Sequence, residues 1–442
     1  MDASVIASHR FGFGPKPDEL NTIAKDPKAW VLRQYRADIN IEFKVTEPSS
    51  QQVVAKNANF RESTRGLKAS DPEKLDQLRD EMTKWMREAY RSYSLDSLQV
   101  AIATDNPAKH RLLEFFSNHF SVSANGGAMM RALAPTLERE AIQPHLQGRF
   151  EDMLLAVEQH PAMLVYLNNA QSFGPNSRFG KRRKKGLNEN LAREILELHT
   201  LGVDGGYTQQ DVTELARGIT GWSIGKTGYV YRDFGHEPGS RTLLGVSYSQ
   251  KGEAQGKKML QDLARHPNTA RHLCTKLARH YVADEPDPKL VSDLITVWQK
   301  SKGNLAEVMQ ALVENDLAWQ APQKFKTPRE FVISTSRSIP NSKITGKRLY
   351  FSLNQLGQVP FTAGSPKGFS DEQMDWMSGS SLLARADWAQ MYAKQSRADV
   401  KLAMNTALNS QMSEHNRLKV LRAESKHQAL TLLMMSPEFQ RR

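Results

Sequence analysis

Ionisable side chains gather in one short stretch, NENLAREILELH at residues 188–199. Glu194 and Glu197 are three residues apart, so on a helix their carboxylates would be neighbours. Two close carboxylates raise the pKa of one of them, which supplies a protonated acid beside an ionised base. The spacing therefore predicts general acid/base catalysis by Glu194 and Glu197, as in a hydrolase or a lyase.

The same stretch also fits the solvated side of an ordinary helix. Arg193 lies one turn from both Glu189 and Glu197, as in a ladder of ion pairs. Each such pair is worth only about 0.2–0.5 kcal/mol and is common on exposed helices. On this stretch alone the solvated face is the favoured interpretation, and the rest of the chain has to decide between the two.

Two histidines could assist the carboxylates. His236 lies in a segment expected to be a loop, beside Asp233 and Glu237, where an imidazole is accessible for proton transfer. A plain turn residue is the equal alternative. His119 is the second candidate, although His119 and His199 both project from apolar arcs, where a hydrogen-bonded core histidine is the ordinary explanation.

Polar and aromatic residues around the acidic stretch are candidates for substrate binding. Trp222, Tyr207 and Tyr229 could form a flat apolar platform for a sugar ring, although aromatic residues more often belong to the core. The complete set of binding candidates is Glu189, Asn190, Arg193, Asn118, Tyr207, Asp211, Trp222 and Tyr229. The sequence contains no HExxH, CxxC, Walker or GxGxxG motif, so we predict neither a metal site nor a cofactor.

Two helices joined by a turn should position the acidic stretch. Leu191, Ile195 and Leu196 fall on one arc and the charged residues on the other, which predicts an amphipathic helix over 188–199. Residues 204–206, DGG, form a turn. Thr208 and Asp211 have capping-box spacing, so a second helix should begin there and complete a helical hairpin.

Helical periodicity dominates the whole chain and predicts a mainly α fold, a multi-helix globular array. One small β-hairpin is expected near 229–244, with His236 near its tip, because Tyr229–Tyr231 alternates and a Gly/Pro turn follows. The polar segment 49–71 is expected to be a loop.

Charge and composition limit the choice of partners. The chain has 442 residues and a formal net charge of +12, with five basic residues in the run KRRKK at 181–185 of an expected loop. Such a run fits a polyanionic partner or a solvated loop. Nucleic acid is an unlikely partner because no recognised binding motif accompanies the run.

Compartment signals are few. The single cysteine, Cys274, excludes an intramolecular disulfide. Without a recognisable signal peptide or transmembrane stretch, the sequence predicts a cytoplasmic protein, with export alongside a partner as the alternative.

Several blocks of the sequence resemble, in order, a large bacterial family catalogued only as domain-of-unknown-function family eighteen hundred. The blocks include RFGFGP, NHFSVS, GLNENLAREILELHTLGVDGGYTQQDVTELARGITGW, SPKGF and SPEFQRR. Because they run nearly from end to end, we expect 1–442 to be one continuous family unit. Within it we distinguish four parts: N-terminal helices at 1–104, a motif-bearing core at 105–250, helices at 251–345 and a C-terminal part at 346–442.

The resemblance implies kinship but no established activity. Genes of that family often neighbour those of a second uncharacterised family, fifteen hundred and one, which looks like secreted sulfatases or phosphatases. The association suggests work on an extracellular or envelope polymer, and the family motif includes Glu194 and Glu197. The sequence therefore favours a hydrolase or lyase acting on a polysaccharide or cell-envelope polymer; the alternative is a non-catalytic protein that binds a polyanion or a neighbouring-gene product.

Overall fold

The computed structural model describes residues 2–36, 38–321, 324–340, 342–344 and 346–442. Helices make up 64% of the chain and the strands form only two small antiparallel sheets within the described residues. The predicted mainly α fold is therefore confirmed.

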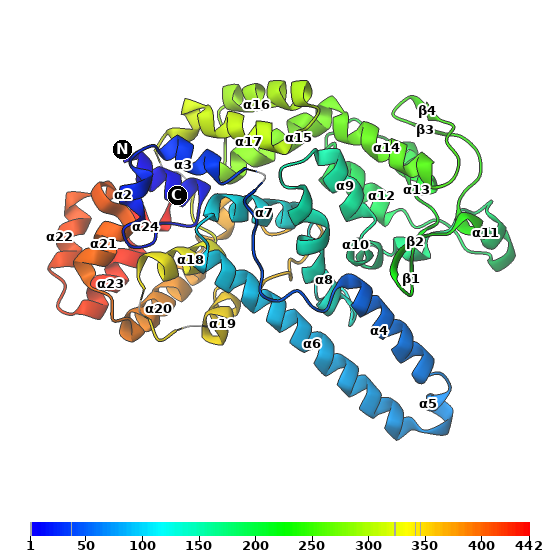
Figure 1. Cartoon of the computed structure of the whole chain (residues 1–442), viewed down its shortest axis with the longest axis horizontal. Helices are drawn as coiled ribbons and strands as arrows, with labels where there is room; N and C mark the ends of the chain where they lie inside the picture. The colour runs from blue at the N-terminus through cyan, green and yellow to red at the C-terminus, as the bar shows by residue number, and fades with distance from the viewer. Residues whose placement is uncertain (1, 37, 322–323, 341, 345) are drawn as a thin grey trace.

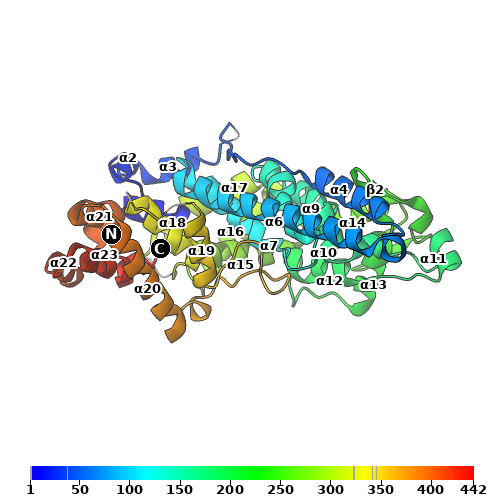
Figure 2. The same ribbon diagram turned by 90° about the horizontal axis from the view of Figure 1, so that it is seen from below.

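The N-terminal part contains an arm that projects from the body of the molecule (Figure 1) and lies in front of it in the view from below (Figure 2). The expectation of a loop at 49–71 is wrong, because Ser49 and Gln52 form a capping box that starts a helix. The buried side chains of Val53 and Val54 anchor the N-terminal end of this helix. The helices of this part are α1 (Ala3–Ile6), α2 (Glu19–Ile23), α3 (Pro27–Arg33), α4 (Ser50–Ser63), α5 (Leu67–Ser70) and α6 (Pro72–Ala103).

The middle part carries the sequence motifs on short helices. These are α7 (Pro107–His119), α8 (Met130–Leu137), α9 (Phe150–Glu158), α10 (Pro161–Tyr166), α11 (Arg178–Arg183), α12 (Asn190–Glu194) and α13 (Gln209–Gly218). The helix expected over 188–199 is α12 continued by a π-helical turn, Ile195–His199, and the capping box of Thr208 and Asp211 starts α13 as predicted. The basic run, expected to be a loop, lies mostly on α11, because Ser177 caps the backbone N–H of Gly180.

The strands form two hairpins, so the expected pairing around His236 is wrong in detail. Strand β1 (Trp222–Gly225) pairs with β2 (Gly228–Tyr231), and β3 (Arg241–Leu243) pairs with β4 (Val246–Tyr248). Both φ angles of the second turn are positive, 50° at Leu244 and 77° at Gly245, as a two-residue hairpin turn requires. Local pairing through tight turns closes shorter loops than pairing across His236, which instead lies in the connection between the hairpins.

The remaining chain is helical. Its helices are α14 (Glu253–Arg265), α15 (Pro267–Tyr281), α16 (Pro288–Ser301), α17 (Leu305–Glu314), α18 (Pro328–Ser338), α19 (Lys347–Gln355), α20 (Gly379–Gln395), α21 (Val400–Leu408), α22 (Glu414–Leu421), α23 (Lys426–Met435) and α24 (Pro437–Gln440). In the part of the chain that the structure describes, none of these or the preceding helices is long and apolar enough to span a membrane.

Buried side chains form two hydrophobic clusters. The larger collects residues between Val5 and Ala318, and the smaller joins the helices of 331–439 to Phe13, Leu98 and Ala101. Helix α6 connects the two clusters, because Met82 and Met86 belong to the larger and Leu98 to the smaller (Figure 1). The N-terminal segment also joins them, through Phe11 and Phe13. The four-part division of the sequence remains a prediction.

Candidate active site

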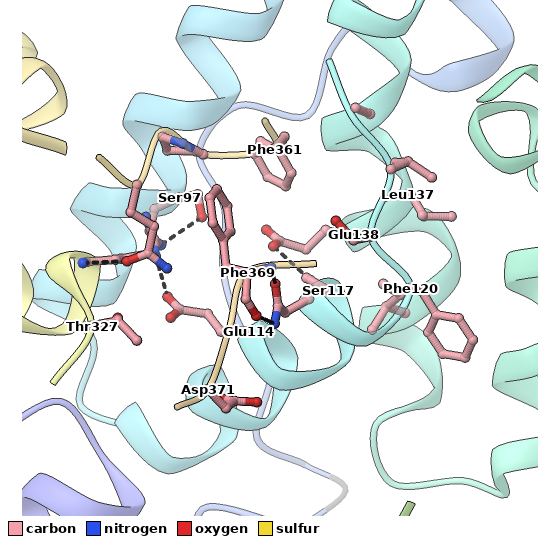
Figure 3. A pocket seen from close by; sticks show the side chains of 18 of the residues that line it. Ser97, Glu114, Ser117, Phe120, Leu137, Glu138, Thr327, Phe361, Phe369 and Asp371 are labelled. Atoms are coloured by element: carbon pink, nitrogen blue, oxygen red, sulfur yellow. Dashed lines mark hydrogen bonds and ion pairs between the residues drawn. The ribbon is translucent and has the colours of Figure 1, made fainter. Parts of the chain in front are cut away.

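A cavity opens beside the larger cluster, between α7, the turn after α8, the end of α15, the start of α18 and the loop 357–371. Its cavity volume is about 110 Å³, and the space is partly open to solvent. Figure 3 shows Glu114, Glu138 and Phe369 around one space. The acidic groups of this cavity form a candidate active site.

Glu138 lines the cavity, and one of its two carboxyl oxygens lacks a hydrogen-bond partner among the described residues. It begins a π-helical turn, Glu138–Ile142, a feature often found at functional positions. The Ser117 hydroxyl donates to Oε2 at 2.9 Å, while Oε1 has no hydrogen-bond partner among the described residues. Burial, helped by the Glu114 carboxylate, raises the pKa of Glu138, which is 5% exposed. A neutral carboxylic acid here can donate a proton from its free oxygen.

Glu114 reaches the same cavity from α7 and is held by an arginine. Arg329 Nε donates to Glu114 Oε1 at 2.8 Å, and the Arg329 guanidinium also contacts the backbone carbonyl and hydroxyl of Ser97. Burial raises the pKa of Glu114 despite this ion pair. The Nη1 of Arg329 is buried without a hydrogen-bond partner within the described residues, and Arg329 lines the cavity.

Asp371 and His280 form a buried acid–imidazole pair on the cavity wall. His280 Nδ1 lies 2.7 Å from Asp371 Oδ1. Burial opposes ionisation of Asp371, but His280, Lys324 and Arg442 together hold its pKa well below the usual value. Burial lowers the pKa of His280, so the ring is neutral, and its Nε2 has no partner among the described residues. A carboxylate that accepts a hydrogen bond from Nδ1–H leaves Nε2 as a base.

Asn118, predicted to bind substrate, lines this cavity and fastens the loop that covers it. Its Oδ1 accepts a hydrogen bond from the Phe369 N–H at 2.8 Å, and its Nδ2 donates to the Phe369 carbonyl at 2.8 Å. Gly368 has φ +85°, and a Cβ there would collide with the Asn118 backbone oxygen. The SPKGF block thus docks on the NHF block, and Asn118 positions the loop.

Replacing Gly368 by Ala should loosen this loop. The alanine would be strained at positive φ and would meet Asn118, which together should destabilise the docked loop by about 1–3 kcal/mol. Limited proteolysis should then cut within 357–371 faster than in the wild type. Gly364→Ala is the matched control because an added Cβ there meets nothing within 4 Å. Equal cleavage of both variants would contradict the proposed docking.

The acidic stretch itself forms a separate surface on α12. Glu194 and Glu197 are partly buried neighbours, but neither lines the cavity described above. Burial, assisted by Glu197, raises the pKa of Glu194. Tyr207 hydroxyl lies 3.5 Å from Glu197 Oε2, so the structure brings Tyr207 to the carboxylates as expected.

The other polar residues of α12 are engaged with α13. Glu189 accepts hydrogen bonds from Thr213 Oγ1 at 2.7 Å and Gln209 Nε2 at 2.8 Å, and Arg193 donates to Gln209 Oε1 at 2.8 Å. Asn190 is exposed. These bonds join the helical hairpin and leave Glu194 and Glu197 as the less engaged acids of the stretch.

His119 and His199 are buried, as their apolar arcs predicted. Lys276 Nζ lies 3.1 Å from His119 Nδ1, and His119 Nε2 lies 3.2 Å from the His199 carbonyl. His199 Nδ1 lies 2.8 Å from Glu158 Oε1, and both of these side chains are fully buried. Both ring nitrogens of His119 therefore have partners.

The remaining candidates lie elsewhere. His236 lies beside Arg178 and Glu237 in another hollow, with Nδ1 2.9 Å from the Thr220 carbonyl. Trp222 is completely buried, so its ring offers no platform on the surface. The Tyr229 hydroxyl donates a hydrogen bond to Glu253, and Asp211 accepts hydrogen bonds from the backbone N–H groups of Thr208 and Leu244. The structure does not bring these four residues to the acidic stretch or the cavity.

Sequence reasoning missed Glu114, Glu138, Arg329, His280 and Asp371. A signal existed for Glu114, because it is a carboxylate inside an otherwise apolar helical segment, LLEFF. Charged residues are rarely buried without a partner. Within the described residues no group of three histidine, cysteine or acidic side chains is arranged to hold a metal ion.

Comparison with known proteins places the chain in a family without a known activity. The model of the family described as protein of unknown function (DUF1800) matches residues 6–441. Neither the curated proteins nor the solved structures include a match. The geometry of the site is therefore the basis for any assignment of function.

Proposed function

The chain belongs to the DUF1800 family of unknown function, and from this premise we propose that it is a hydrolase or lyase that uses acid–base catalysis in the Glu138 cavity on a polysaccharide or envelope polymer. The observation that carries the proposal is the unpartnered Glu138 Oε1, on a buried carboxyl group of raised pKa, in a cavity that also holds the Asp371–His280 pair. Groups whose environments shift their pKa values in different ways are typical of acid/base sites.

Glu138 serves as the general acid. Its burial keeps it protonated at a pH where an ordinary glutamate is ionised, and Ser117 fixes the other oxygen. In a glycoside, Glu138 donates its proton to the bridging oxygen as the bond from that oxygen to the sugar carbon breaks. The leaving group departs as an alcohol.

His280 serves as the general base. Asp371 holds the ring through Nδ1, so the free Nε2 accepts a proton from an attacking water, or from carbon in a lyase. In hydrolysis the water oxygen bonds to the sugar carbon. Asp371 stays ionised throughout and stabilises the imidazolium that forms.

The rim of the cavity suits a ring-shaped substrate. Phe361 and Phe369 are partly buried and border the space beside Glu138 (Figure 3). Aromatic faces pack against the apolar face of a sugar. The free Nη1 of Arg329 can donate to a substrate hydroxyl or carboxylate.

A screen of oligosaccharides and envelope polymers tests this proposal. New reducing ends report hydrolysis, and ultraviolet absorbance reports the unsaturated product of a lyase. We expect a bell-shaped dependence of turnover on pH. Rising pH removes the Glu138 proton at its raised pKa, and falling pH protonates His280, whose pKa is lowered.

The alternative proposal is a non-catalytic protein that docks an envelope partner or the product of a neighbouring gene. It predicts a stable stoichiometric complex and no product in any screen. A complex whose formation is unaffected by substitutions in the Glu138 cavity, with no turnover, would replace the catalytic proposal.

A further inference from the structure

Helix α11 presents a cluster of unpaired positive charge at one end of the molecule (Figure 1). Within the described part of the chain none of its basic side chains forms an ion pair, although all of them are exposed. The members of this basic tip are Arg178, Lys181, Arg182, Arg183, Lys184 and Lys185. Asp233, an exposed acid, lies in the turn Asp233–Gly235 that packs against α11.

The basic tip is held rigidly. Gly174 N–H donates to the Gly235 carbonyl at 2.9 Å, and Phe173 N–H donates to the Gly186 carbonyl at 3.1 Å, which closes the segment at both ends. Glu237 accepts hydrogen bonds from the backbone and side chain of Asn176. A loop that served only solubility would not need this anchoring, because like charges held together repel each other.

Aromatic side chains lie beneath and beside the charges. Phe179 of α11 packs on Phe173 with ring centroids 4.5 Å apart and on Phe234 at 5.7 Å. Phe234 is 41% exposed, and among the phenylalanines that the structure describes only Phe351 is more exposed. Arg182 lies over the Phe179 ring at 6.0 Å.

We propose that the basic tip binds the surface of an anionic lipid bilayer. The cations would meet the lipid phosphates while Phe234 enters the headgroup region, the pairing of basic and aromatic groups typical of peripheral membrane attachment. The tip projects from the end of the molecule, which suits a flat surface. A nucleic-acid strand would instead be expected to follow a basic groove lined with stacking aromatic residues.

Sedimentation with vesicles tests this proposal on the full-length protein. We expect binding to phosphatidylcholine vesicles that contain phosphatidylglycerol, little binding to phosphatidylcholine alone, and release at high salt. Each basic residue near an anionic membrane strengthens binding about fivefold, so the triple variant K181Q/R182Q/R183Q should weaken it by about 100-fold. Phe234→Ser should weaken it several-fold with less dependence on salt.

The matched control removes the same charge elsewhere. K401Q/K419Q/K426Q neutralises three exposed lysines on α21, α22 and α23, at the opposite end of the molecule (Figure 1). This variant should change vesicle binding less than twofold, because a basic residue strengthens binding by about fivefold only when it lies near the membrane surface. Equal losses in both triple variants would show a diffuse effect of net charge and overturn the proposal. So would equal binding to neutral and anionic vesicles, or binding to single-stranded DNA or heparin without vesicle binding.

Discussion

Glu138→Gln should lower turnover by about 100- to 10 000-fold, the usual contribution of a general acid. Glutamine resembles the protonated carboxyl in shape and charge, and its oxygen can still accept the Ser117 hydrogen bond. It has no proton to release to the leaving group. The melting temperature should therefore stay close to that of the wild type while kcat falls.

Two comparisons make this result decisive. Glu307→Gln removes an exposed carboxylate from the first turn of α17 and should leave turnover unchanged. Glu194→Gln and Glu197→Gln test the acidic stretch that the sequence indicated. If either abolishes turnover while Glu138→Gln retains it, catalysis lies on α12 and not in the cavity.

Glu330→Gln should destabilise the protein by about 3–5 kcal/mol, the cost of breaking a buried ion pair by removing one partner. Glu330 is 4% exposed and lies between two buried arginines, Arg111 and Arg442, the latter at 3.0 Å from Oε2. Glutamine can keep the hydrogen bond to the Thr327 N–H, but it leaves both guanidinium groups without their counter-charge. Urea unfolding and the melting temperature measure the loss.

The pH dependence of stability gives this prediction a second readout. Burial opposes ionisation of Glu330, but Arg111 and Arg442 lower its pKa to about 2 from the usual 4.5. Its stabilising contribution is therefore complete above pH 4.5 and is lost as the pH falls toward 2. Glu330→Gln should reduce the slope of stability against pH in that window.

A surface ion pair provides the control for Glu330. Glu62 pairs with Lys226 Nζ at 3.4 Å, and both side chains are 74% exposed. Glu62→Gln should cost less than about 1 kcal/mol, because solvent screens such pairs. A similar small loss for Glu330→Gln would mean that the buried network contributes little to stability.

The helical character of the protein could be predicted from the sequence because apolar periodicity and capping residues act locally. The capping box of Thr208 and Asp211 is an example, since three residues determine where α13 begins. The segment 49–71 was misjudged because its helix is anchored mainly by Val53 and Val54, which is too few apolar positions for a recognisable period. The predicted strand pairing was wrong because the sequence did not mark the short turns at 226–227 and 244–245 as the connections.

The candidate site was harder to predict because its residues come from segments far apart in the chain. Glu138 and Ser117 are separated by 21 residues, and His280 and Asp371 by 91. Neither pair has a spacing that a sequence motif would reveal. Asn118 was identified through the resemblance, but its bond to Phe369, 251 residues away, shows that it holds a loop.

The sequence by itself determined the family, the mainly α fold, the caps of individual helices and the burial of His119 and His199, because each follows from matched motifs or local periodicity. Only the tertiary structure decided which carboxyl groups share a cavity and which are occupied by neighbours. The pKa of a carboxyl group depends on burial and on charges within a few ångströms. Those distances are set by how the helices pack, and residue spacing along the chain does not contain them.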